Sequence, residues 1–111
     1  MTHRMSLVGT AFDAICAGRK TVEIRLNDEK RAIINVGDVI EFEEEKTRKK
    51  ICCTVKRLTR FKDFSELYQA FDKTAIGYGA EESADPRDMF TFYSPDRIKR
   101  YGVLAIEIET V

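Results

Sequence analysis

The chain has 111 residues, which suffices for one hydrophobic core, and we expect a single domain over residues 1–111. Nineteen basic and 19 acidic side chains leave a formal net charge of zero, so the molecule as a whole has no electrostatic attraction to nucleic acid. No apolar run approaches the roughly 18–20 residues that cross a bilayer, which predicts a protein without a membrane partner.

The cysteine pattern argues against both a disulfide framework and a metal site. Cys16, Cys52 and Cys53 show no C-x-x-C spacing, and the only histidine, His3, is distant from them in sequence. Polar residues also interrupt the N-terminal apolar stretch, unlike a signal peptide. We therefore expect a reduced, cytoplasmic protein with no metal and no cofactor, in which the cysteines are small packing residues.

In chain order, the sequence first predicts a strand over residues 3–8 and a short helix over residues 10–18. Thr10 is a suitable N-cap for this helix, and Gly18 is typical of the left-handed residue that ends one. Helical spacing places three apolar side chains on one face: Phe12, Ile15 and Cys16.

Residues 21–26 predict a strand whose apolar face packs and whose polar face carries Glu23 and Arg25 together with Thr21. Lys20 lies at the junction before this strand, where its side chain can turn toward the other two charges. In an enclosed site, a carboxylate between two cations stays ionised and orients them, so the group can hold an anion or a polar planar group. The alternative is an exposed ion pair on a solvated strand face.

After a polar loop at 27–35, residues 36–44 and 51–61 predict two strands joined by a hairpin tip. Residues 46–62 carry eight basic side chains and no acidic one. Such a segment can follow a nucleic-acid backbone through its local field. Alternatively, its basic side chains pair with the acidic arm across the hairpin.

The last third predicts helices at 63–71, around 86–92 and from Pro95 to Gly102, followed by a strand over 103–111. Asp63 and Glu66 fit a capping box, and Ser94 fits an N-cap. The segment before the second helix contains Gly77-Tyr78-Gly79, which lacks the spacing of a phosphate loop and predicts a mobile hinge. Aromatic residues in this region are able to stack on a base, although spacing favours a core position for the first of them: Phe90, Phe92 and Tyr93.

This order of elements predicts an α+β fold, in which a mixed or antiparallel sheet of five or six strands curls into a small barrel with helices capping its ends. Two motifs, Gly18-x-Lys20-x-x-Glu23-x-Arg25 and residues 36–42 (VGDVIEF), resemble the ASCH domain, a family of the PUA-like superfamily. Tyr93-Ser94 and residues 101–108 are similar to the family's C-terminal pattern, so the resemblance covers nearly the whole chain.

The resemblance implies a PUA-like barrel that binds RNA or a nucleotide or nucleoside in a cleft. The cleft is lined by the charged strand and by the loop after the middle helix. The ligand-binding residues that it implies are Lys20, Glu23, Arg25, Tyr93 and Ser94.

As an alternative function, the resemblance implies an amidohydrolase acting on N4-acylated cytosine nucleosides, because some small bacterial members hydrolyse N4-acetylcytidine. The lysine of those enzymes corresponds to Lys20, but their threonine nucleophile is replaced here by Glu23, and their glutamate corresponds to Glu81 or Glu82. Catalysis would then use Glu23 as a general base on water, Lys20 at the oxyanion and Glu82 in proton transfer. Alternatively, Thr21 would replace the missing threonine as the nucleophile.

Overall fold

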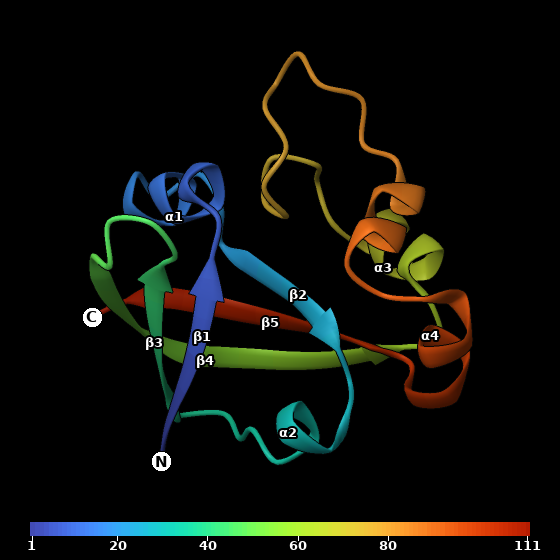
Figure 1. The fold of residues 1–111 in the computed structure, drawn as a ribbon, viewed down its shortest axis with the longest axis horizontal. Helices are drawn as coiled ribbons and strands as arrows, with labels where there is room; N and C mark the ends of the chain where they lie inside the picture. The colour runs from blue at the N-terminus through green and yellow to red at the C-terminus, as the bar shows by residue number, and fades with distance from the viewer.

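Five strands form one curled sheet in the computed structural model, which describes residues 1–111 (Figure 1). The strands are β1 (Thr2–Leu7), β2 (Val22–Leu26), β3 (Val39–Glu44), β4 (Lys50–Phe61) and β5 (Val103–Thr110), in the spatial order β1-β3-β4-β5-β2. β1 and β3 are parallel, and the other pairs are antiparallel. Because the edge strands β1 and β2 do not pair with each other, the sheet is a half-barrel rather than a closed barrel, and the expected α+β class with a curled mixed sheet is confirmed.

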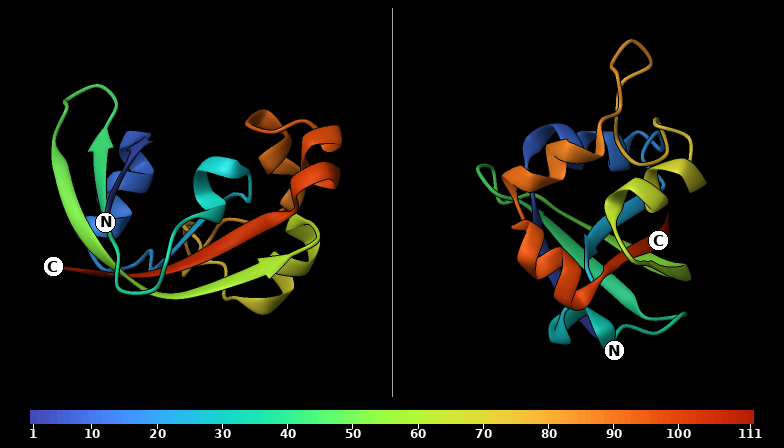
Figure 2. Two further views of the ribbon diagram at one scale, coloured as in Figure 1. Left: turned by 90° about the horizontal axis from the view of Figure 1, so that it is seen from below. Right: turned by 90° about the vertical axis from the view of Figure 1, so that its right-hand side faces the viewer.

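The helices gather at the two ends of this sheet. Figures 1 and 2 place α1 (Gly9–Cys16) at one end and α3 (Phe64–Ala70), the 3₁₀ helix η1 (Pro86–Thr91) and α4 (Pro95–Tyr101) at the other. A further short helix, α2 (Glu29–Ala32), follows β2 on the side that the sheet curls around. None of the helices is long and apolar enough to cross a bilayer.

The core is divided into two clusters that β5 joins. Leu104, Ile106 and Ile108 of β5 pack in the cluster beneath α1, whereas Val103 and Ala105 pack in the cluster beside α3 and α4. Both faces of this strand are therefore covered over most of its length, which explains why its sequence is almost continuously apolar.

Three local predictions are wrong. Thr10 is not an N-cap: α1 already begins at Gly9, with Val8 before it and no side-chain cap. Cys16 is exposed, as is Cys52, so these two cysteines are not packing residues. Phe90 is about half exposed, because η1 has the tighter turn of a 3₁₀ helix and buries Met89 instead.

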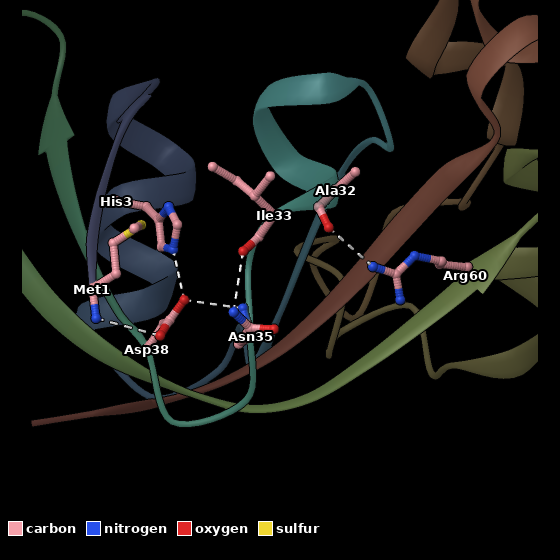
Figure 3. A network of polar contacts seen from close by, with 7 residues as sticks. All are labelled: Met1, His3, Ala32, Ile33, Asn35, Asp38 and Arg60. Atoms are coloured by element: carbon pink, nitrogen blue, oxygen red, sulfur yellow. Dashed lines mark hydrogen bonds and ion pairs between the residues drawn. The ribbon is translucent and has the colours of Figure 1, made fainter.

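The predicted polar loop at 27–35 contains α2, which the sequence analysis did not anticipate. Asp28 caps this helix by accepting a hydrogen bond from the Arg31 amide. None of its four residues is buried, so it shows no apolar periodicity. The guanidinium of Arg60 reaches back from β4 to the carbonyl of Ala32, at 3.5 Å (Figure 3).

Asp38 connects the start of β1 to the turn before β3 (Figure 3). Its carboxylate lies 2.8 Å from His3 Nε2 and accepts from the Asn35 amide at 3.0 Å and the Met1 ammonium at 3.4 Å. The hydrogen bond with His3 is the largest cause of the low pKa of Asp38, which is about 2. This network therefore links β1 and β3, two parallel strands that lie far apart in the sequence.

Four of the eight cations in the basic segment 46–62 pair with acidic side chains, and two of these pairs cross the hairpin as the second interpretation of its charges predicts. Arg48 lies 3.0 Å from Glu43 across the hairpin, and Lys50 lies 3.2 Å from Glu41. On the other side of β4, two pairs join it to β5: Lys56 with Glu109 and Arg57 with Glu107. The cations are exposed, so each pair contributes little to stability.

Candidate ligand-binding site

A cavity of about 550 Å³ lies where five parts of the chain meet. Its wall is formed by the end of β1 and start of α1, by residues 20–25, by Glu45 after β3, by the segment from α3 to Glu82, and by residues 88–93. These parts can be followed in Figure 1, in which β2 runs between α1 and the long loop after α3. The cavity thus opens beside the unpaired edge of the half-barrel.

Lys20, Glu23 and Arg25 form one connected group on the β2 wall of this cavity. Lys20 Nζ is 2.9 Å from Glu23 Oε1, and Arg25 donates to Glu23 Oε2 from Nε at 2.9 Å and from Nη2 at 2.7 Å. Glu23 is only 3% exposed and Lys20 only 7%. The three charges therefore do not form an exposed ion pair on a solvated face.

Glu23 has no accepting position left for a ligand. Its Oε1 also accepts from the Ile24 amide at 3.2 Å, so two hydrogen bonds reach each oxygen. A carboxylate offers about four lone-pair positions, and all are used here. The geometry gives Glu23 the role of orienting the two cations.

The charge of Glu23 is maintained by its two partners. Burial, the largest single influence, raises the pKa of this carboxyl, but Lys20 and Arg25 together outweigh it and lower the pKa to about 2. Burial would likewise lower the pKa of Arg25, whereas the Glu23 carboxylate raises it above its ordinary value. Glu23 and Arg25 are thus both ionised at neutral pH.

The two cations on this wall differ in how fully their donors are used. The Lys20 ammonium has three N–H donors, of which one faces Glu23 and one points to the Ile76 carbonyl at 3.4 Å. Arg25 Nη2 donates to the Ser6 carbonyl at 2.9 Å, a contact that crosses from β2 to β1 over the open side of the sheet. The third Lys20 donor is therefore available to a ligand, whereas the Arg25 guanidinium also interacts with Tyr93.

Another part of the cavity wall carries a chain of hydroxyl groups that ends on a carboxylate. Tyr78 Oη is 2.7 Å from Asp88 Oδ2 and 3.0 Å from Tyr68 Oη. Because a carboxylate only accepts, Tyr78 donates to Asp88 and Tyr68 donates to Tyr78. Burial and then these two hydrogen bonds raise the pKa of Tyr78 well above its usual range, so the phenol stays protonated.

The other residues named from the sequence are distributed unequally. Glu82 lines the cavity and Glu81 does not, and the Glu82 carboxylate accepts from the Gly79 amide. Tyr93 also lines the cavity, with its ring stacked on Phe64 at 6.0 Å between centroids. Ser94 caps α4 by accepting from the Arg97 amide and lies outside the cavity lining.

Tyr68 and Asp88 also line the cavity, although their sequence pattern did not mark them as site residues. They reach the cavity from α3 and η1, and no spacing within either element marks them. Tyr78 had a local signal, since it is an aromatic residue between two glycines, but the hinge reading did not place it in the wall. Within the structure, no group of three or more potential metal ligands is found.

Comparison with known proteins places this geometry in a family. A family model described as ASCH domain matches residues 5–111. The structure resembles the crystal structure of hypothetical protein PH0355, at 32% identity and a TM-score of 0.85, with both chains fully covered. It also resembles the solution structure of PF0455 from Pyrococcus furiosus, at 32% identity and a TM-score of 0.77, over 100% of this chain and 98% of that one.

A more distant likeness is confined to the fold. The crystal structure of ASCH from Zymomonas mobilis is 16% identical, with a TM-score of 0.69 over 97% of this chain and 66% of that one. No protein with a curated description matches the chain. The family match and the resemblance of the motifs agree, and the chain belongs to the ASCH domain family.

Proposed function

We propose that this ASCH domain binds RNA and takes one unpaired base into the cavity. The observation that carries the proposal is the buried Lys20–Glu23–Arg25 group, which leaves oriented donors on the cavity wall. Donors of this kind suit the carbonyl oxygens and ring nitrogens of a base. The family resemblance, with its expected RNA, nucleotide or nucleoside ligand, supports the same choice.

The charges around the cavity favour a base over a phosphate group. Besides Lys20 and Arg25, which are already paired with Glu23, the lining includes three further carboxylates: Glu45, Glu82 and Asp88. The acidic side chains therefore outnumber the cationic ones, and a dianionic phosphate would meet net repulsion inside. A neutral base with amino donors and carbonyl acceptors has partners on both walls.

Aromatic side chains at the cavity provide a stacking surface. Phe92 lines the cavity while remaining 61% exposed, and it lies 6.5 Å from the Tyr93 ring. A large apolar ring held in water at the edge of a polar cavity is suited to cover a base. This contact tolerates different bases, so base preference would come from the polar walls.

A Lys20→Met variant tests the proposal. We expect its affinity for single-stranded RNA to fall about tenfold or more, because one charge-assisted hydrogen bond is lost while Arg25 still pairs Glu23. Fluorescence anisotropy with a labelled RNA of mixed sequence measures this change, and calorimetry with the four ribonucleosides measures binding in the cavity alone. Lys62→Met removes an exposed lysine outside the cavity and serves as the control.

The proposal is overturned if the unaltered protein binds neither the RNA nor any ribonucleoside. It is also overturned if Lys20→Met binds both as well as Lys62→Met does. Circular dichroism of each variant establishes that the fold is retained, so that a loss of binding reports on the site.

The amidohydrolase alternative has less support from the geometry. A carboxylate with a pKa of about 2 and four hydrogen bonds is a weak general base, which argues against Glu23 in that role. Thr21 is exposed and does not line the cavity, whereas Thr10 and Glu82 do. Incubation with N4-acetylcytidine, followed by its ultraviolet spectrum, distinguishes the functions: turnover that Lys20→Met abolishes would favour the hydrolase.

A further inference from the structure

A second depression adjoins the cavity at the open side of the sheet, and we call it the β1 groove. Ser6 and Arg25 line both the cavity and the groove, so the two depressions adjoin at these residues. Of the ten residues that line the groove, six are cationic and two are acidic. The cations are Arg4, Arg25, Lys30, Arg31, Arg48 and Lys50.

We propose that the β1 groove binds the sugar–phosphate backbone of the RNA whose base enters the cavity. This inference rests on the proposed function and adds the path that the strand takes across the surface. The charges of the two depressions differ in sign, since acidic residues outnumber cations in the cavity and cations outnumber acidic residues in the groove. Base and backbone are thus each matched to one of the two neighbouring sites.

The two carboxylates of the groove do not cancel its cations. Glu41 lies 3.6 Å from Arg4 and 3.2 Å from Lys50, and Glu43 lies 3.0 Å from Arg48. The Arg4, Arg48 and Lys50 side chains remain 86%, 73% and 58% exposed. Exposed pairs of this kind are weak, so a phosphate can recruit these cations at little cost.

Two further cations belong to α2 and differ in their freedom. Lys30 is exposed and makes no ion pair, so its ammonium is available without breaking any contact. Arg31 is held by Asp28, with Nη1 2.9 Å from Oδ2, and its side chain is only 17% exposed. Lys30 is therefore unpaired, Arg31 is fixed in direction by Asp28, and both line the same groove.

Arg25 marks the junction between the two sites. Its guanidinium is directed by Glu23 and by the Ser6 carbonyl, and it lines both depressions. A nucleotide with its base at the Lys20 wall would leave the cavity past this side chain. The shared position of Arg25 connects base recognition with backbone binding.

The test compares two triple variants that change net charge equally. Arg4→Gln, Lys30→Gln and Lys50→Gln together remove two paired cations and one unpaired cation from the groove. Lys56→Gln, Arg57→Gln and Lys99→Gln remove the same kinds of charge from outside both depressions. Binding of labelled single-stranded RNA is measured by anisotropy over a range of salt concentrations, and ribonucleoside binding by calorimetry.

We expect the groove variant to bind RNA about tenfold or more weakly at low salt than the control variant. The slope of log affinity against log salt should fall by about 2, since each lost phosphate contact contributes roughly 0.7 for a single strand. Ribonucleoside binding should be unchanged. Equal RNA affinities and equal slopes for the two triple variants would overturn the proposal that the groove binds the RNA backbone.

The two proposals fail in different ways. In one outcome, ribonucleoside binding depends on Lys20 but RNA binding is the same in the groove variant and its control. This result would overturn backbone binding by the groove and leave base binding in the cavity standing. RNA binding that depends on the groove cations but not on Lys20 would uphold the groove and overturn the placement of the base.

Discussion

Glu23 carries its charge in a place where a carboxylate would normally be neutral. Burial alone would raise its pKa, and the two cations beside it outweigh that effect and lower the pKa to about 2. The alternation of residues 21–26 predicted that Glu23 and Arg25 share a face, and the junction position of Lys20 allowed it to join them. The second cavity wall was not predictable in this way, because Tyr68, Tyr78 and Asp88 meet only after distant segments have packed.

The charge of Glu23 makes stability depend on pH. Its pKa of about 2 lies below the ordinary value of 4.5, so the unfolded chain binds more protons between these values and stability is lost as the pH falls from 4.5 toward 2. The difference corresponds to on the order of 3 kcal/mol. In Glu23→Gln we expect a flatter decline of the unfolding free energy over this interval, measured by urea denaturation at a series of pH values.

A control for this measurement is Glu45→Gln, which changes an exposed carboxylate of the same cavity. Asp38, whose pKa is also about 2, is present in both variants and contributes equally to them. The same pH slope in both would contradict the account of Glu23.

At the scale of elements, the loop after α3 determines where the Lys20 side chain can lie. Gly77 has a φ of +114°, and a Cβ atom there would stand 3.2 Å from Lys20 Cδ and 3.4 Å from Nζ. The loop backbone thus packs directly on the lysine, while the Ile76 carbonyl accepts from its ammonium. Loop and strand position the ammonium together.

Gly77→Ala should therefore weaken RNA binding as well as stability. A Cβ at this positive φ is strained, and it also presses on Lys20. Gly37→Ala is the matched control, because Gly37 has a φ of +92° with no atom within 4 Å of the added Cβ. We expect thermal unfolding to show both variants destabilised, and anisotropy to show weaker RNA binding for Gly77→Ala alone; equal RNA binding would contradict the contact.

The elements differed in how readily the sequence predicted them. Strands with clear alternation and helices with polar caps were anticipated, including α3, in which Asp63 accepts from the Glu66 amide as expected of a cap. The helix α2 was not, because it buries no side chain and offers no apolar repeat. Phe90 was misplaced since helical spacing of 3.6 residues does not apply to a 3₁₀ turn.

For the molecule as a whole, the parallel pairing of β1 with β3 and the open side between β1 and β2 lay beyond sequence reasoning. Both depend on contacts between segments far apart in the chain, which local periodicity does not report. The three cysteines differ in burial for the same reason: Cys53 of β4 is fully buried in the core cluster beneath α1, whereas Cys16 and Cys52 are exposed.

Thiol reactivity offers a measure of global unfolding. Burial raises the pKa of Cys53 to about 11, and the thiolate is the reactive form, so this residue should react only when the sheet opens. With a chromogenic disulfide reagent at neutral pH, we expect two thiols to react quickly and the third at a rate that rises with urea. In Cys53→Val the slow phase should vanish; three equally fast thiols in the unaltered protein would contradict the packing.

The place of β5 in the sheet has a consequence for synthesis of the chain. β2, which carries Glu23 and Arg25, has β5 as its only strand neighbour, and β5 comprises residues 103–110. During synthesis, the strand with these two charges must wait for about eighty later residues before it can dock. The wall of the proposed site that β2 carries is therefore assembled late, and we expect a fragment that stops short of residue 103 to leave β2 without its strand partner.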